Sequence, residues 1–214
     1  MRARQRHRPV LAGISIGRAD VKSQATLGMA VYRNGMAGFV ITVQHAMLGG
    51  VMIQPGYEVD GIDDGIPSQT PGFGDPIATY LDEDSSIQLY KLNPGVESKP
   101  GCIIDYGMID DYVRGEEYEF LSKNTPVVMY GRTSGRVEGV IAETPFISGP
   151  LKIKPRANYS EPLTNPGDSG SPWILEEPGQ PVKLVALHNH RYGSSYGIPV
   201  HPAFHTLSLS LKET

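Results

Sequence analysis

Short runs of apolar residues, separated by turn residues, recur along most of the chain. The segment LGMAVYRNGMAGFVITVQHA holds two such runs on either side of Arg33-Asn34-Gly35. Asn-Gly is typical of a two-residue β-hairpin, because both central residues of such a turn need a positive φ. The segment TYLDEDSSIQLYKL alternates apolar and polar positions, which is typical of β-strands.

The same pattern returns in the second half of the chain. Short apolar segments spaced by turn residues follow one another there: TPVVMYGRTSG, RVEGVIAETPF, GPLKIKPRAN, GSPWILEE and PVKLVALHNH. This spacing predicts an all-β barrel or sandwich. The last segment, HPAFHTLSLSL, is predicted to form one short C-terminal helix, since Pro202 suits a first helical turn.

Two irregular stretches interrupt the strand pattern. Residues 54–76 form a long loop rich in Gly and Pro, and the acidic stretch around 105–124 connects two β halves. The predicted division is a basic disordered arm at 1–9, an N-terminal β unit at 10–105, a linker at 106–124, a C-terminal β unit at 125–200 and a C-terminal helix and tail at 201–214.

Composition agrees with short strands and many turns. The chain has 214 residues with 25 Gly and 18 Pro, and 39% hydrophobic residues are enough to bury a core. The formal net charge of −4 gives no indication of nucleic-acid binding. Arginines alternate along the first eight residues. A solvated tail is the favoured interpretation of this arm, and a tether to nucleic acid or a membrane surface is the alternative.

Cysteine usage and hydropathy limit the setting in which the protein works. Cys102 is the only cysteine, so no intramolecular disulfide is possible, and we interpret it as an inert thiol. The N-terminus lacks an apolar run of signal-peptide length, and no segment approaches the ~20 apolar residues of a membrane-spanning helix. These features favour an intracellular protein that does not bind a membrane.

The segment Asn165-Pro166-Gly167-Asp168-Ser169-Gly170-Ser171-Pro172 carries the sharpest chemical signal. Glycines before and after Ser169 allow the backbone to bend tightly around an exposed hydroxyl. That geometry can aim the N–H groups of Gly167 and Ser169 at one point, where they would stabilise an oxyanion. The alternative is a Gly-rich turn that only connects two strands.

A serine needs a base to act as a nucleophile. His45 ends the apolar run GFVITVQH and precedes the small Ala46, so its ring can point into a cleft. The alternative is an ordinary core or surface histidine. Asp84 opens DSSIQL, where a strand begins with small residues around a carboxylate, and Asp82 and Glu83 are its competitors.

Together these three segments resemble the trypsin/chymotrypsin superfamily of serine proteases. Gly167-Asp168-Ser169-Gly170-Ser171-Pro172 matches the nucleophile motif of that family, and Thr42-Val43-Gln44-His45-Ala46 is similar to its Thr-Ala-Ala-His-Cys segment. Asp84-Ser85-Ser86-Ile87 is similar to its Asp-Ile-Ala-Leu segment, and the order His, Asp, Ser agrees as well. Vertebrate members place a disulfide cysteine where this chain has Ala46.

The resemblance covers roughly residues 25–210 and implies a fold and a mechanism. The fold is an all-β, chymotrypsin-like double β-barrel with a short C-terminal helix and a cleft between the barrels. His45 and Asp84 would lie on the first barrel and Ser169 on the second. The implied activity is serine endopeptidase, with Ser169 as nucleophile, His45 as general base and Asp84 as the carboxylate that orients it.

The family resemblance also assigns a structural role to Asp168. In the family this position lies beneath the oxyanion loop and pairs with a buried amine or another donor. The partner in this chain is not identified by sequence; a freed N-terminus and a Lys or Arg side chain are the candidates.

Residues around the expected P1 pocket indicate specificity. Leu163 stands where trypsin-like enzymes carry an acidic residue, so a preference for Lys or Arg is not expected. Thr164 and His188 would face each other across the pocket and could hydrogen-bond a carboxylate or carboxamide. This pair resembles that of glutamyl endopeptidases and of Glu/Gln-cutting viral relatives. We therefore predict Glu or Gln at P1; the alternative is that both residues are ordinary structural polar groups.

Other polar clusters carry weaker signals. The pairs His188/His190 and His201/His205 lack further ligands, and the acidic loop residues Glu58, Asp60, Asp63 and Asp64 lack a recognised calcium spacing. We expect no metal and no cofactor. The expected partner is a polypeptide substrate, and nucleic acid is not expected. A peptide-binding or scaffold module on the same fold is the alternative function.

Overall fold

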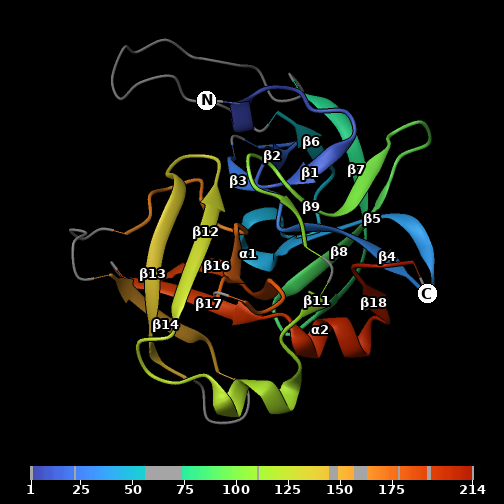
Figure 1. Cartoon of the computed structure of the whole chain (residues 1–214). Helices are drawn as coiled ribbons and strands as arrows, with labels where there is room; N and C mark the ends of the chain where they lie inside the picture. Colours follow the sequence, from blue (N-terminus) through green and yellow to red (C-terminus); the bar gives the residue numbers. More distant parts are fainter. Residues whose placement is uncertain are drawn as a thin grey trace, which may run out of the picture.

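The computed structural model describes residues 2–21, 23–55, 74–109, 111–144, 149–156, 163–177, 179–191 and 194–213. The acidic loop residues considered for calcium, Glu58, Asp60, Asp63 and Asp64, lie outside this part of the chain. The described residues form mostly short β-strands arranged in three sheets, so the all-β prediction is confirmed (Figure 1).

The first sheet forms an open half-barrel. Its strands are β2 (Ser15–Arg18), β3 (Ala25–Thr26), β4 (Met29–Arg33), β5 (Met36–Val43), β6 (Met52–Gln54), β7 (Asp75–Asp84), β8 (Ile87–Leu92) and β18 (Leu209–Ser210). They are ordered β18-β4-β5-β8-β7-β6-β2-β3. The short helix α1 (Gln44–Met47) directly follows β5.

The second sheet closes on itself. Its strands are β11 (Asp111–Tyr112), β12 (Pro126–Gly131), β13 (Gly135–Glu143), β14 (Leu151–Pro155), β15 (Pro172–Leu175), β16 (Lys183–Arg191) and β17 (Ser194–Pro199). The order is β11-β16-β15-β12-β13-β14-β17, and the additional pairing of β16 with β17 closes a barrel from β12 to β17. We call this the C-terminal barrel and the open sheet the N-terminal barrel.

Three strands and three helical segments complete the described chain. The strands β1 (Val10–Ala12), β9 (Ser98–Ile103) and β10 (Gly107–Met108) form a separate small sheet. The helical segments are α2 (His201–Thr206) and 3-10 turns at Arg2–Arg4 and Gly115–Phe120. No helix of the described residues is long and apolar enough to span a membrane.

The hairpin predicted at Asn34-Gly35 is confirmed. Arg33 pairs with Met36, and the two residues between them have φ values of 50° and 74°. Positive φ at both central positions defines the type I′ turn, whose twist matches that of the strands on either side.

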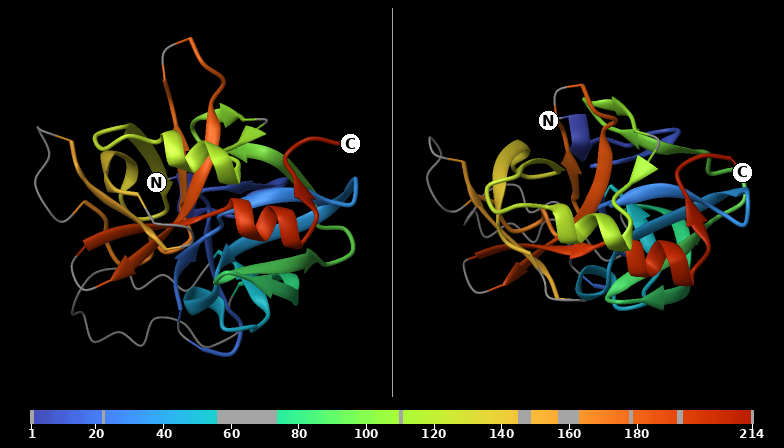
Figure 2. Two further views of the ribbon diagram at one scale, coloured as in Figure 1. Left: turned by 90° about the horizontal axis from the view of Figure 1, so that it is seen from below. Right: turned by 60° about the horizontal axis from the view of Figure 1, so that its bottom comes forward.

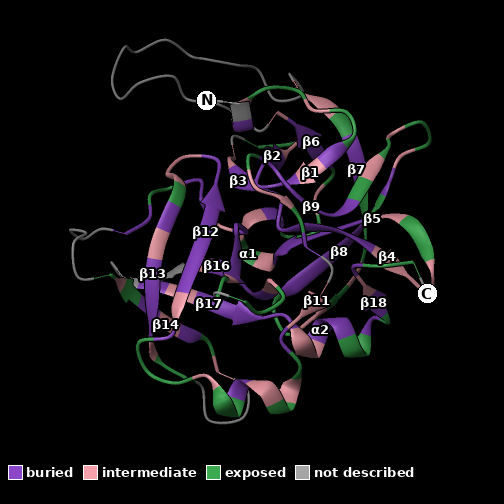
Figure 3. Cartoon of the chain, in the orientation of Figure 1, coloured by how far each residue is buried: buried purple, intermediate pink, exposed green. Residues whose placement is uncertain are grey.

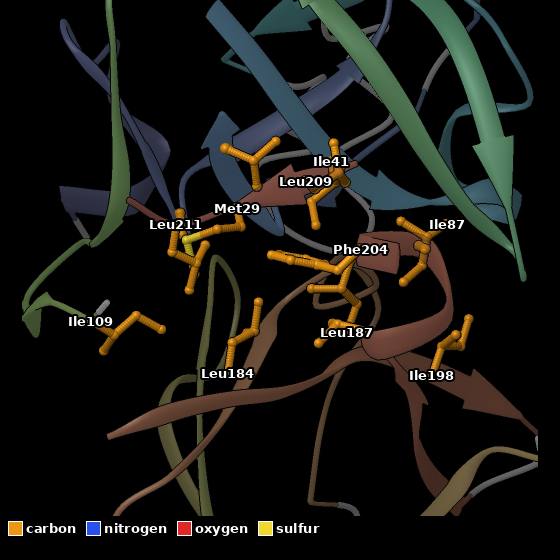
Figure 4. Packing of buried hydrophobic residues seen from close by; sticks show 14 of the residues in the cluster. Met29, Ile41, Ile87, Ile109, Leu184, Leu187, Ile198, Phe204, Leu209 and Leu211 are labelled. Atoms are coloured by element: carbon orange, nitrogen blue, oxygen red, sulfur yellow. The ribbon is translucent and has the colours of Figure 1, made fainter. Parts of the chain in front are cut away.

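Buried residues fall on the strands of both barrels (Figure 3). Each barrel buries a core of its own, and a third cluster contains residues from both. We call this third group the interface cluster. Figure 4 shows its members converging from the two barrels and the C-terminal segment: Met29, Ile41, Ile87, Leu184, Leu187, Ile198, Phe204, Leu209 and Leu211. Burial of this apolar surface fixes the position of one barrel against the other.

The C-terminal segment crosses from one barrel to the other. Helix α2 covers only His201–Thr206, and the following β18 pairs with β4, so the predicted segment is a helix followed by a strand. The helix lies beside the N-terminal barrel (Figures 1 and 2). The alternation in LSLSL explains the strand, because period two places Leu209 and Leu211 on one buried face.

The N-terminal arm lies against the N-terminal barrel. Ala3 is buried, Arg6 forms an ion pair of 2.7 Å with Asp75, and Arg8 donates a hydrogen bond of 2.6 Å to Gln54. The sequence predicts a disordered arm here, because alternating arginines have no apolar pattern. The polar contacts of the described part of the arm are made with Gln54, at the end of β6, and Asp75, at the start of β7.

Candidate active site

Ser169 lies on a tight loop that begins with a type II turn. The N–H of Asp168 donates to the carbonyl of Asn165 at 3.1 Å, and Gly167 has a φ of 97°. A type II turn needs positive φ at its third residue and favours Pro at its second, which Gly167 and Pro166 supply. Within the described residues, the N–H groups of Gly167 and Ser169 donate to no other protein group.

The carboxylate of Asp168 anchors this loop from below. It is completely buried and accepts four hydrogen bonds: from the N–H groups of Thr133, Ser134 and Asn165 and from the hydroxyl of Ser134. Thr133 and Ser134 belong to the turn between β12 and β13. The donors found for Asp168 are therefore uncharged: three belong to the neighbouring hairpin, and the fourth, the N–H of Asn165, belongs to the serine loop itself. Hydrogen bonds of this kind offset the cost of burying the carboxylate.

The serine loop also docks on the N-terminal barrel through Thr26. Its N–H donates to the carbonyl of Ser169 at 2.8 Å, and its hydroxyl donates to the carbonyl of Gly167 at 2.9 Å. The carbonyl of Thr26 in turn accepts from the hydroxyl of Thr42 at 3.0 Å. Gly170 has a φ of 93°, and a β-carbon there would collide with the Thr26 carbonyl, so only glycine permits this approach.

His45 reaches the serine from the other barrel. It lies in α1, immediately after β5, and its Nε2 is 2.9 Å from the Oγ of Ser169 (Figure 1 shows α1 where the barrels meet). The two residues are far apart in sequence, and the docking of the loop on Thr26 brings them together. A neutral imidazole at this distance can accept the hydroxyl proton.

Asp84 lies on the turn that supports the segment before His45. The turn between β7 and β8 has positive φ at Ser85 and Ser86, and the carbonyl of Ser86 accepts a hydrogen bond of 2.8 Å from the N–H of Gln44. The carboxylate accepts from the hydroxyl of Ser85 at 2.9 Å. The acidic turn is thus joined to the segment before His45 through the backbone of Ser86 and Gln44.

The competing carboxylates are engaged elsewhere. Asp82 forms an ion pair of 3.0 Å with Arg33. Glu83 accepts hydrogen bonds of 3.2 Å from Gln44 and 2.8 Å from Gln88. Asp84 differs from both, because its hydrogen bond comes from the hydroxyl of the adjacent Ser85.

The residues predicted to select the P1 side chain are buried in the C-terminal barrel. The hydroxyl of Thr164 lies 3.1 Å from that of Ser195, and Nδ1 of His188 accepts a hydrogen bond of 3.3 Å from the indole of Trp173. Strand β16 pairs His188 with Gly197 and His190 with Ser195, so Ser195 and His188 lie on one face of the sheet. Thr164 therefore lies on the same side of the barrel as His188.

The hydrogen bond from the indole of Trp173 determines which tautomer a neutral His188 adopts. An indole N–H can only donate, so Nδ1 is the acceptor and the ring proton is on Nε2. Leu163, the third predicted pocket residue, is 8% exposed and belongs to the core of the C-terminal barrel.

Several residues that organise the site were not found by sequence reasoning. These are Thr26, Thr133, Ser134 and Trp173, and they act through contacts with partners distant in sequence. Only Trp173 carried a usable signal, as the one tryptophan directly after the serine motif. The described residues contain no cluster of three or more His, Cys, Asp or Glu side chains that could hold a metal ion.

Comparison with known proteins places the fold. No family model and no curated protein sequence matches the chain. Solved structures do match: Cellulomonas bogoriensis chymotrypsin at a TM-score of 0.61 and 15% identity, covering 96% of this chain and 99% of that one. Thermobifida fusca protease A matches at a TM-score of 0.61 and 13% identity, covering 96% of this chain and 99% of that one.

A third similar structure is a glutamic-acid-specific serine protease described as using a histidine triad in substrate binding. Its TM-score is 0.65 at 12% identity, covering 95% of this chain and 100% of that one. The chain therefore has the chymotrypsin-like double β-barrel fold, which these three proteases share. At these identities the similarity establishes the fold.

Proposed function

We propose that this chain is a serine endopeptidase that hydrolyses peptide bonds through Ser169, His45 and Asp84. The observation that carries the proposal is the contact of 2.9 Å between His45 Nε2 and Ser169 Oγ, formed across the two barrels. Beside it lie the N–H groups of Gly167 and Ser169, which have no other acceptor in the part of the chain that the structure describes. A nucleophile, its base and two oxyanion donors in one place are the requirements of acyl transfer.

The reaction follows from this geometry. Ser169 attacks the scissile carbonyl while His45 accepts its proton, and the N–H groups of Gly167 and Ser169 stabilise the resulting oxyanion. His45 then protonates the leaving amine, and water hydrolyses the acyl-enzyme by the same steps in reverse order. Asp84 is assigned the role of orienting His45. Its carboxylate would turn toward the imidazole as positive charge develops there.

The test of this function is covalent labelling together with peptide cleavage. Wild-type protein is expected to react with a fluorophosphonate at Ser169 and to cut a proteome-derived peptide library, and Ser169→Ala is expected to do neither. Removing the nucleophile of such a unit lowers kcat by about 10⁶-fold in a related mechanism, so no residual cutting should be measurable. A wild type that binds peptides but is not labelled would instead be a peptide-binding module.

We further propose Glu or Gln as the preferred P1 residue. Thr164 and His188 lie on one side of the C-terminal barrel, and a neutral His188 presents its proton on Nε2. A hydroxyl and an imidazole N–H suit the oxygen of a side-chain carboxylate or carboxamide. The glutamic-acid-specific protease among the similar structures is a neighbour with this kind of preference.

A substrate series tests the pocket separately from the mechanism. Peptides that differ only in Glu, Gln, Phe, Leu or Arg at P1 should show the highest kcat/KM with Glu or Gln. His188→Leu should lower that preference by about 10²-fold or more, because a buried polar substrate group loses its partner. Best cleavage after Arg or Phe would sink the pocket assignment and leave the mechanism intact.

A further inference from the structure

Each of the two oxyanion N–H groups belongs to a peptide whose carbonyl is held by a side-chain hydroxyl. The N–H of Gly167 shares its peptide with the carbonyl of Pro166, which accepts a hydrogen bond of 2.9 Å from the hydroxyl of Thr133. The N–H of Ser169 shares its peptide with the carbonyl of Asp168, which accepts one of 2.6 Å from the hydroxyl of Ser171.

These contacts decide where the donors point. In a trans peptide the C=O and N–H groups point in opposite directions, and neither of these two peptides is cis. A hydroxyl that holds the carbonyl on one side of the loop therefore directs the N–H to the other side. Rotation of the Pro166–Gly167 peptide by half a turn would convert the type II turn to type I and remove the Gly167 donor from the site.

The two carbonyls differ in the number of hydrogen bonds that they accept. Among the described residues, Thr133 is the one donor to the Pro166 carbonyl. The Asp168 carbonyl also accepts from the N–H of Ser171 at 2.9 Å, so its peptide keeps one partner without the hydroxyl. Ser171 is completely buried, and Thr133 is half-buried beside Gly167. A hydrogen bond to a carbonyl also polarises its own peptide and strengthens the N–H as a donor.

Resting on the proposed serine-protease function, we propose that Thr133 and Ser171 are positioning residues whose hydroxyls orient and polarise the two oxyanion donors. Thr133 has the larger effect because it holds its carbonyl alone. Neither residue touches the substrate, and both act through the backbone of the serine loop. Thr133 belongs to the turn that also holds the Asp168 carboxylate, so one hairpin both anchors the loop and sets the direction of its first donor.

The variants are Thr133→Val, Ser171→Ala and the conservative Thr133→Ser. Tyr118→Phe is the matched control, because the hydroxyl of Tyr118 also donates to a backbone carbonyl of the C-terminal barrel, that of Val185. Neither Tyr118 nor Val185 belongs to the serine loop. The control therefore removes a similar contact without touching the peptides that carry the oxyanion donors.

The experiment measures kcat and KM on a cleavable peptide and the inhibition constant of a peptide aldehyde with the same sequence. The aldehyde forms a tetrahedral adduct whose oxygen occupies the oxyanion position. Thr133→Val should lower kcat about 10- to 100-fold with KM nearly unchanged, and should weaken the aldehyde by the same factor, since a misdirected donor acts only on the transition state. Ser171→Ala should show a smaller loss, and Thr133→Ser should restore activity.

The outcomes separate this proposal from the proposed function. Wild-type turnover with kcat retained in both Thr133→Val and Ser171→Ala would overturn the positioning role and leave the protease assignment standing. So would losses in kcat that merely follow the lowered melting temperature and are equalled by Tyr118→Phe. A wild type that neither cleaves nor reacts with a fluorophosphonate would overturn the protease function, and this proposal with it.

Discussion

Hydroxyl groups do much of the structural work around Ser169. Thr26 connects the serine loop to the N-terminal barrel and is itself held by the hydroxyl of Thr42, and Thr133 and Ser134 connect the loop to the β12–β13 turn. Ser and Thr side chains are short enough to hydrogen-bond nearby backbone without separating the chains. The loop is thus held by hydrogen bonds from uncharged donors, including those that the buried carboxylate of Asp168 accepts.

The role of Asp84 can be tested by comparing the three consecutive acids. Asp84→Asn should lower kcat by about 10³- to 10⁴-fold, because an amide cannot stabilise the imidazolium or fix its tautomer. Asp82→Asn and Glu83→Gln are the matched controls. They should change kcat little, since their carboxylates bind Arg33, Gln44 and Gln88 instead. Steady-state kinetics on one peptide decides between them. A large loss in Glu83→Gln with none in Asp84→Asn would transfer the role to Glu83.

Short elements connect His45 and the acidic turn to the N-terminal barrel. The β7–β8 turn holds Ser85 and Ser86 at positive φ, a conformation that costs about 1–2 kcal/mol for each residue other than glycine. The hydrogen bond from the N–H of Gln44 to the carbonyl of Ser86 helps to offset this cost. The strained turn and the base are therefore coupled through the backbone just before α1.

Helix α2 carries a histidine that should make stability depend on pH. Burial lowers the pKa of His201 below its ordinary value of 6.5, and the positive charges of His205 and Arg114 lower it further. The imidazole ring also stacks on the ring of Tyr112, with 6.4 Å between the ring centroids. The folded chain therefore takes up this proton less readily than the unfolded chain. The contribution to stability is complete above pH 6.5 and is lost as the pH falls from 6.5 through the lowered folded pKa.

His201→Gln should make stability less dependent on pH in this range. Urea unfolding of wild type at pH 7.5 and 5.5 should show a loss of stability at the lower pH, and the variant should show a smaller loss. An equal pH response in wild type and His201→Gln would contradict the assignment to His201.

At the scale of the whole molecule, the interface cluster makes the two barrels one structural unit. Phe204 is buried at its centre, 4.5 Å from the ring of Tyr112, and its neighbours come from both barrels (Figure 4). The contact between His45 and Ser169 spans the same junction. The geometry of the site therefore depends on apolar packing that lies outside it.

Phe204→Ala should destabilise both barrels together. The cavity left by a buried phenylalanine costs about 3–5 kcal/mol. Trp173, the single tryptophan, reports on the C-terminal barrel by fluorescence, and far-UV circular dichroism reports on both barrels. Both signals should shift to lower urea concentration by the same amount. Phe120→Ala, at an 83% exposed position, should leave them unchanged. An unshifted Trp173 transition in Phe204→Ala would mean that the barrels unfold independently.

The sequence by itself determined the all-β class and the Asn34-Gly35 hairpin. It also singled out His45 and Ser169, which the structure brings within 2.9 Å of each other, and their catalytic roles stay predictions. These are local properties: strand periodicity, the positive φ of turn residues and a glycine-flanked serine are all written in consecutive residues. The domain boundaries and the P1 pocket stay predictions, as does the role of Asp84. The short extent of α2 could not be foreseen, because pairing of β18 with β4 competes with continuation of the helix.

Only the tertiary structure decided how the site is held together. The donors to Asp168, the docking of the serine loop on Thr26 and the indole bound to His188 join residues far apart in the chain. Such contacts depend on how two β-barrels close and pack, and no local pattern of residues encodes that register. The distance of 2.9 Å between His45 Nε2 and Ser169 Oγ results from this packing, although the sequence alone identifies both residues as candidates.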